Sequence, residues 1–203
     1  MTSKYIIGLT GSIATGKTTV ANMLRQKGFE VIDTDRIAHK LMAKGQANYQ
    51  KILAYFGPDI LDDFLEIDRK KLAAIVFDRP DQLMKLNELS HPEIFGAINK
   101  RIEDSPNKLL FVEIPLLFEL SMAGKLDLDL DETWLVYVDK EGQLERLKQR
   151  NKLTDQEANA RINSQMPVND KRHYADFILF NDKDIYHLHA QIKERLKDYE
   201  SFR

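Results

Sequence analysis

The chain has 203 residues, of which 43% are hydrophobic and 31% are charged, with a formal net charge of −2. This composition is typical of a globular protein and excludes a disordered chain. The small net charge provides no basic field for nucleic acid, and no apolar run approaches the ~20 residues of a membrane helix, so we expect neither a nucleic-acid nor a membrane partner. The chain contains no cysteine, which fits a cytoplasmic location.

The first part of the chain alternates between strand and helix patterns. An apolar run predicts a buried strand over residues 5–10, and helical spacing over 18–27 ends at Gly28. A second strand is expected over 29–32. The order strand, helix, strand predicts a parallel sheet.

Residues 36–104 contain no strand-like run and show helical periodicity instead. We therefore expect a helical insertion after the second strand. Breaks in this helical pattern are expected at three dipeptides: Gly57-Pro58, Arg79-Pro80 and His91-Pro92.

The second half of the chain predicts three more strands, over residues 109–114, 133–138 and 177–180. Asp139 is expected to cap a helix, and Thr154 with Glu157 has the pattern of a capping box at the start of another. A closing helix is expected over 185–199. Leu and Asp alternate over 126–131, which indicates a surface loop or a sheet edge.

Residues 11–18 match the phosphate-loop pattern GxxxxGK[ST] at every fixed position, between a predicted strand and a predicted helix. Glycines let successive N–H groups point at a phosphate, and the helix N-terminus adds its positive end. Lys17 is expected at the β- and γ-phosphates and Thr18 at Mg²⁺. The pattern predicts that ATP and Mg²⁺ bind here. The expected nucleotide-binding residues are Gly11, Ser12, Ile13, Ala14, Thr15, Gly16, Lys17, Thr18 and Thr19.

A phosphate loop also occurs in nucleotide-binding switch proteins. A GTPase needs a DxxG motif and a later NKxD motif, and residues 139–142 spell the first. Residues 151–154, Asn-Lys-Leu-Thr, lack the carboxylate of the second. We therefore favour a kinase and keep a switch protein as the weaker alternative.

Phosphoryl transfer to an alcohol needs a group that orients the hydroxyl and accepts its proton. Asp33 and Asp35 follow the second strand, where ligands gather in parallel sheets, and both can face one side if the strand continues. Asp33 is the candidate base and Arg36 a candidate anion contact. The alternative is that Asp33 to Asp35 only cap the next helix; the location favours a functional role for Asp33, whereas for Asp35 capping is an equal alternative. Glu113, at the end of the third strand, is a candidate for holding Mg²⁺ through water.

Basic residues are frequent between 140 and 173. Converging cations would neutralise the charge that develops on a transferring phosphoryl group, whereas isolated ones would pair with neighbouring glutamates on solvated helices. The candidates are Arg146, Arg150, Arg161, Lys171 and Arg172.

Blocks spread over nearly the whole chain resemble the dephospho-coenzyme A kinase family. The HP and PLLFE blocks are far more specific than the phosphate loop. The blocks are IIGLTGSIATGKTTVA at 6–21, VIDTD at 31–35, LNELSHP at 86–92, VEIPLLFE at 112–119, QLERLKQR at 143–150, RINSQ at 161–165 and ADFILFN at 175–181.

The resemblance implies an α/β fold, a P-loop kinase with a five-stranded parallel sheet flanked by helices, a helical substrate-binding insertion and a lid. It implies ATP-dependent phosphorylation of the ribose 3′-hydroxyl of dephospho-coenzyme A, with another P-loop nucleotide or small-alcohol kinase as the alternative. The partner would be this small-molecule substrate, and the protein a monomer or weak homo-oligomer. The implied domains are a nucleotide-binding core of 1–35, 106–139 and 174–203, a coenzyme A (acceptor) domain of 36–105, and a lid of 140–173.

The resemblance also implies residue roles by position. Asp33 would be the base, Lys17 and Arg146 would lie at the phosphates, and Asn181 would lie near the adenine. Acceptor-side blocks contain His91, Pro115 and Leu116. The chain departs from the family's usual residues in having Ser12 and Ala14 for glycines, Glu113 for aspartate, and Asp182-Lys183 where a glycine often follows the last block.

Overall fold

The computed structural model describes residues 4–76 and 79–202. The chain forms two compact units, one from residues 1–32 and 106–203 and the other from Asp33–Ser105. We call the first the sheet unit and the second the helical unit. The functional roles assigned from the sequence to the core, the acceptor domain and the lid stay predictions.

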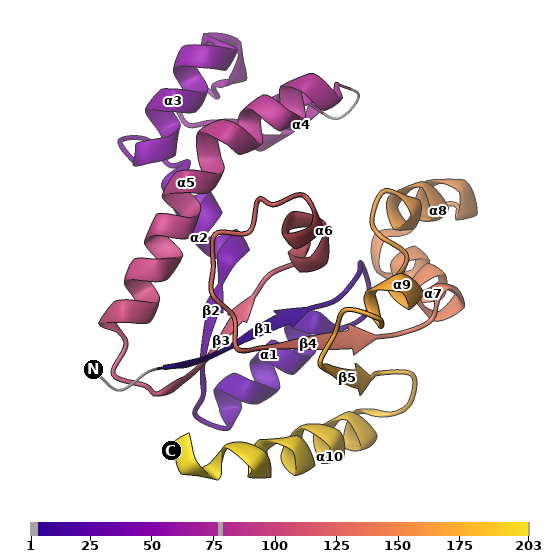
Figure 1. The fold of residues 1–203 in the computed structure, drawn as a ribbon. Helices are drawn as coiled ribbons and strands as arrows, with labels where there is room; N and C mark the ends of the chain where they lie inside the picture. The colour runs from indigo at the N-terminus through magenta and orange to yellow at the C-terminus, as the bar shows by residue number, and fades with distance from the viewer. Residues whose placement is uncertain (1–3, 77–78, 203) are drawn as a thin grey trace. The chain divides into compact units, whose positions relative to one another are not determined.

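Five strands form one sheet with the order β2-β3-β1-β4-β5 (Figure 1). Their bounds are β1 Tyr5–Thr10, β2 Glu30–Asp33, β3 Leu109–Glu113, β4 Glu132–Tyr137 and β5 Phe177–Phe180. The pairs β1·β3, β1·β4 and β4·β5 are all parallel. The predicted strands are confirmed, with ends that differ from the expected ones by no more than one residue.

One face of the sheet is covered by α1 (Lys17–Gln26) and α10 (Ile185–Arg195), which lie below the strands in Figure 1. Ile7 and Leu9 of β1 are fully buried against these helices, as the two-residue period of a strand requires. The other face of β1 is closely covered, because a Cβ added to Gly8 would lie 2.6 Å from a methyl carbon of Leu117 in α6 (Leu117–Met122). The expected closing helix stops at Arg195, and a 3₁₀ helix, Leu196–Phe202, follows it.

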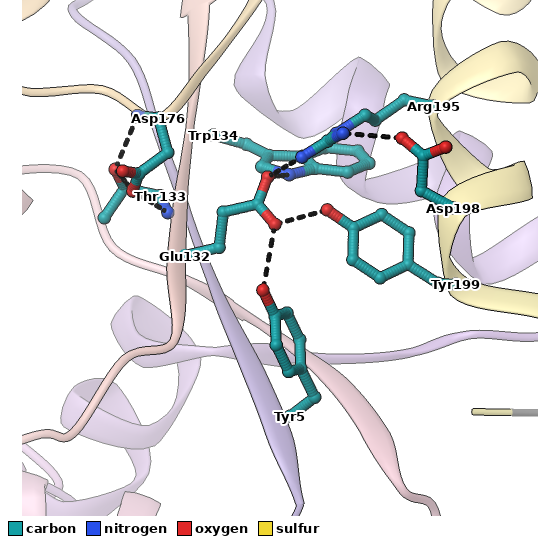
Figure 2. Close-up of polar contacts among 8 residues, drawn as sticks. All are labelled: Tyr5, Glu132, Thr133, Trp134, Asp176, Arg195, Asp198 and Tyr199. Carbon is teal, nitrogen blue, oxygen red and sulfur yellow. Dashed lines mark hydrogen bonds and ion pairs between the residues drawn. The ribbon is translucent and has the colours of Figure 1, made fainter. Parts of the chain in front are cut away.

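The C-terminal segment is fastened to the sheet by a buried carboxylate, Glu132 (Figure 2). Arg195 Nη2 lies 2.6 Å and Trp134 Nε1 2.8 Å from Glu132 Oε1, while the hydroxyls of Tyr199 and Tyr5 donate to Oε2. Burial is the main cause that raises the pKa of both tyrosines, and the neighbouring Glu132 raises it further. Burial and the hydrogen bond that the Tyr199 hydroxyl donates to Glu132 therefore favour the neutral phenol in the folded chain.

Three helices lie between β4 and β5: α7 Lys140–Asn151, α8 Asp155–Asn163 and α9 Val168–Lys171. Both predicted caps are confirmed. Asp139 Oδ1 accepts the N–H of Gly142 at 2.8 Å, and Thr154 and Glu157 form a full capping box. Residues 126–130 are neither helix nor strand, and the Asp131 carboxylate accepts the N–H of Ile6 in β1 at 2.7 Å.

The helical unit consists of α2 Thr34–Leu41, α3 Ala47–Phe56, the 3₁₀ turn Pro58–Ile60, α4 Arg69–Val76 and α5 Pro80–Asp104. Helices α2, α3 and α4 each pack on the long α5. The predicted breaks at Gly57-Pro58 and Arg79-Pro80 are confirmed, and Pro80 occupies the first turn of α5, where its missing N–H costs nothing. The core of this unit is made by Tyr49, Ile52, Ile60, Ile67, Leu72 and Val76.

The break expected at His91-Pro92 is wrong, because α5 continues through Pro92. An interior proline removes one helical hydrogen bond and disfavours a straight helix. Polar contacts next to the proline help to hold this helix: Ser90 Oγ donates to the Leu86 carbonyl at 2.6 Å, and Asn48 Nδ2 donates to the Ser90 carbonyl at 3.2 Å. Tertiary packing therefore overrides the local signal here.

Candidate active site: a phosphate loop braced by β5, α7 and the segment after α8

The predicted phosphate loop joins β1 to α1, and its glycines are required by its geometry. Gly16 has φ +94°, in the left-handed region that side chains avoid. A Cβ on Gly11 would lie 2.5 Å from Thr15 Oγ1 and 3.0 Å from the Val136 carbonyl. Ala14 also has a positive φ, 63°, which is uncommon for a residue with a side chain. The loop therefore has a tightly specified backbone ahead of the N-terminus of α1.

The end of β5 supports the loop from one side through Asn181, which is 9% exposed. Asn181 Nδ2 donates to the Thr15 carbonyl at 2.8 Å, and the backbone carbonyl of Asn181 accepts from Arg146 Nη2 of α7 at 2.6 Å. The contact leaves no space above Gly16, since a Cβ there would lie 2.3 Å from Asn181 Nδ2. The structure thus brings Arg146 and Asn181 to the phosphate loop. The adenine contact expected of Asn181 stays a prediction.

Lys17 is held by a carboxylate from the neighbouring strand. Glu113 ends β3, pairs in register with Leu9 of β1, and is 5% exposed. Lys17 Nζ lies 3.0 Å from Glu113 Oε1, and Arg25 Nη2 lies 3.6 Å from Oε2. This places the Lys17 ammonium at the carboxyl end of β3, on the edge of the sheet where the phosphate loop begins.

Among the described residues, Thr18 has the chemistry that a Mg²⁺ site beside the phosphates requires. The hydroxyl of Thr18, exposed in the first turn of α1, is an oxygen ligand of the kind that Mg²⁺ takes together with phosphates and water. Glu113 faces two cations, so its expected role toward Mg²⁺ stays a prediction. Within residues 4–76 and 79–202, no three His, Cys, Asp or Glu side chains gather in a way that could hold a metal ion.

The basic residues of 140–173 do not all converge. Lys171 is completely buried, and its Nζ lies 2.7 Å from Glu119 Oε1 of α6. Arg172 lies over the ring of Tyr137, 5.1 Å from its centroid. Arg150 Nε donates to its neighbour Asn151. Arg161 is exposed on α8. Of these five residues, Arg146 is the one whose described contacts link it to the phosphate loop, through Asn181.

The acceptor-side candidates are divided between the two units. In the helical unit, Asp33 caps α2 by accepting the N–H of Arg36 at 3.0 Å, and the ring of His91 packs edge-on against Phe95. The strand does not continue to Asp35, so the condition for Asp33 and Asp35 to face one side of a strand is not met: α2 begins at Thr34 and Asp35 lies in its first turn. In the sheet unit lie Pro115, whose carbonyl accepts from Thr10 Oγ1 at 3.4 Å, and the 40% exposed Leu116.

Sequence reasoning missed two side chains that contact the site. Gln165 Oε1 accepts the N–H of Ile13 inside the phosphate loop at 2.8 Å, and Arg25 shares Glu113 with Lys17. Gln165 lies in the RINSQ block, but a glutamine just after a helix end has no periodic or charge signal of its own. Arg25 is on the exposed side of α1, where the pattern indicates only solvation.

The strand, phosphate loop and helix on a five-stranded parallel sheet define a P-loop kinase. A model of the dephospho-CoA kinase family matches residues 5–187. The chain belongs to this family.

Individual relatives agree with this family. A dephospho-CoA kinase from Carboxydothermus hydrogenoformans is 43% identical over 190 residues, covering 92% of this chain and 90% of the relative. The structure of dephospho-CoA kinase from Campylobacter jejuni superposes with a TM-score of 0.71 at 31% identity, over 98% of each chain. Shikimate kinase from Acinetobacter baumannii shares the fold, with a TM-score of 0.52 at 15% identity over 98% of this chain and 96% of its own. Among the helices that the structure describes, none is long and apolar enough to cross a membrane.

Proposed function

We propose that this chain transfers the γ-phosphoryl group of ATP to the ribose 3′-hydroxyl of dephospho-CoA, which yields CoA and ADP. The single observation that carries the proposal is the braced phosphate loop in a chain whose family relatives are dephospho-CoA kinases over nearly their full length. The loop and the N-terminus of α1 supply donors for the β- and γ-phosphates.

The site residues have separate roles in this proposal. Lys17 and Arg146 bind phosphate oxygens and offset the negative charge of the transition state. Thr18 would hold Mg²⁺ through its hydroxyl, and the ion would supply positive charge that offsets the negative charge of the phosphates. Asp33 orients the acceptor hydroxyl and takes its proton. No phospho-enzyme is required, so the transfer is direct.

The remaining roles follow the same proposal. Residues 36–105 bind the acceptor, and residues 140–173 act as a lid that excludes water from the reacting phosphoryl group. Asp35, Arg36, His91, Pro115 and Leu116 belong to the acceptor side. We further propose a monomer or weak homo-oligomer that works in the cytoplasm, which the absence of cysteine supports.

The first test is coupled ADP release with ATP and Mg²⁺, with and without dephospho-CoA. The proposal predicts release that depends on dephospho-CoA. Release that depends instead on a nucleoside monophosphate or another small alcohol would replace the acceptor and keep the kinase. Nucleotide exchange with slow hydrolysis and no dependence on any acceptor would indicate a switch protein.

The base assignment is tested by Asp33→Asn. Asparagine is as good an N-cap as aspartate, so α2 keeps its cap while the proton acceptor is removed. Turnover should fall at least ~10²-fold, with ATP affinity near that of the wild type. The matched control is Asp184→Asn. Asp184 caps α10 by accepting the N–H of His187 at 2.8 Å, and this variant should keep full activity. Full turnover in Asp33→Asn would overturn the assignment.

A further inference from the structure

The phosphate loop is contacted by a side chain from the segment between α8 and α9. Gln165 Oε1 accepts the backbone N–H of Ile13 at 2.8 Å, although 152 residues separate the two in sequence. The orientation of the amide is chemically determined, because only its oxygen can accept a hydrogen bond from an N–H group. This contact uses a donor from the loop that would otherwise face solvent or a ligand.

The chain segments on both sides of Gln165 are fixed by tertiary contacts. On one side, α8 packs its apolar residues Ala158 and Ile162 in a cluster with Ile13 and Ala14 of the loop. On the other side, the N–H of Met166 donates to Glu119 Oε1 at 3.0 Å.

The anchor on Glu119 is itself fixed in position. The same carboxylate oxygen lies 2.7 Å from the ammonium of Lys171, which has no exposed side-chain surface. The neighbouring carboxylate offsets part of the cost of burying the lysine side chain. The backbone that carries Gln165 is therefore fixed by packing and by the ion pair of Glu119 with the buried Lys171.

The loop is consequently braced from two directions. Asn181, at the end of β5, donates to the Thr15 carbonyl, and Gln165 accepts from Ile13 two residues earlier. Between these two points, Ala14 has the strained positive φ of 63°. A residue in this conformation persists where its surroundings determine it.

We propose that Gln165 is a positioning residue that sets the shape of the phosphate loop through the Ile13 amide, and so couples the lid segment to ATP binding. It acts through the loop backbone without touching the nucleotide. The inference rests on the proposed function for two points, that the nucleotide is ATP and that residues 140–173 act as a lid.

The test compares two substitutions of Gln165. Gln165→Met keeps the length of the side chain and removes the acceptor, whereas Gln165→Glu keeps an acceptor oxygen. In nucleotide-free protein, hydrogen exchange of the Ile13 amide, followed by NMR, should become at least ~10-fold faster in Gln165→Met and stay near wild type in Gln165→Glu. Equal exchange rates of Ile13 in the wild type and Gln165→Met would overturn the proposal.

A second readout separates positioning from general structure. Gln165→Met should raise the Kd and KM for ATP about 5- to 10-fold, the size of one net hydrogen bond, and leave the KM for dephospho-CoA unchanged. The control is Gln149→Met on α7. The exposed amide of Gln149 donates to Glu145 Oε1 at 3.2 Å, and its loss should alter neither value. Unchanged ATP affinity in Gln165→Met, or an equal change in the control, would contradict the inference.

The two proposals fail separately. Exchange of Ile13 and the Kd for ATP are measured without any acceptor, so they stay informative if dephospho-CoA is not the substrate. Conversely, a wild-type enzyme that makes CoA, together with a Gln165→Met variant that binds ATP normally, would remove this inference alone.

Discussion

Gly16→Ala perturbs the phosphate loop at the point where backbone conformation and side-chain space are both restrictive. Gly16 has φ +94°, and a Cβ there would lie 2.3 Å from Asn181 Nδ2, which donates to the Thr15 carbonyl. The left-handed conformation costs a residue with a Cβ about 1–2 kcal/mol. Displacing Asn181 loses a hydrogen bond worth about 1 kcal/mol and leaves a buried carbonyl without its donor. The expected loss in the free energy of unfolding is therefore about 2–4 kcal/mol.

Gly28→Ala is the matched control, because Gly28 has φ +88° and nothing within 4 Å of an added Cβ. Its free energy of unfolding should fall only by the cost of the left-handed conformation, about 1–2 kcal/mol, and it should bind ATP normally. Urea unfolding measures the first quantity and calorimetric titration with ATP the second. We expect Gly16→Ala to weaken ATP binding at least ~10-fold, since the loop amides must move to relieve the clash.

A double variant isolates the clash from the strain. In an Asn181→Ala background the space above Gly16 is open, so Gly16→Ala should there cost no more than Gly28→Ala does. The reasoning is refuted if Gly16→Ala in the wild-type background is as stable as Gly28→Ala and retains full ATP affinity.

Two further predictions concern buried hydroxyls. The folded-state pKa of Tyr199 is raised above the ordinary value of 10.0, so the stability that its neutral phenol contributes is present below pH 10 and is lost as the pH rises further. Tyr199→Phe should flatten this alkaline fall in the free energy of unfolding. An unchanged slope would contradict the raised pKa. Ser12 Oγ is buried without a hydrogen-bond partner in the described part of the chain, whereas the similarly buried Ser90 donates to the Leu86 carbonyl. Ser12→Ala should therefore raise the free energy of unfolding by about 1 kcal/mol, and Ser90→Ala should lower it by a similar amount. Urea unfolding measures both changes. A loss of stability in Ser12→Ala would show that the Ser12 hydroxyl is hydrogen-bonded.

The strands and the phosphate loop could be predicted because their signals are local. Short apolar runs bounded by turns indicate buried strands, and a glycine such as Gly16 is required wherever a loop must adopt a positive φ. The helix caps at Asp139 and Thr154 were predictable for the same reason, since the donor and acceptor lie three residues apart.

Features that depend on tertiary contacts could not be predicted in this way. The continuation of α5 through Pro92 depends on contacts that include a bond from Asn48, 42 residues away from Ser90 in sequence. The contact of Gln165 with Ile13 and the burial of Lys171 depend on how the segment after α8 lies on the sheet unit. A basic residue in a charged segment is usually solvated, so no local signal indicated that Lys171 is buried and paired with Glu119.

The most direct test of the central claim follows the transferred group itself. ATP labelled in its terminal phosphoryl group is incubated with the enzyme, Mg²⁺ and dephospho-CoA, and the products are separated and identified by mass spectrometry and ³¹P NMR. The account predicts CoA with the label in its ribose 3′-phosphate and one ADP formed for each CoA. Label that is recovered only as inorganic phosphate, or on an acceptor other than the 3′-hydroxyl, would contradict it.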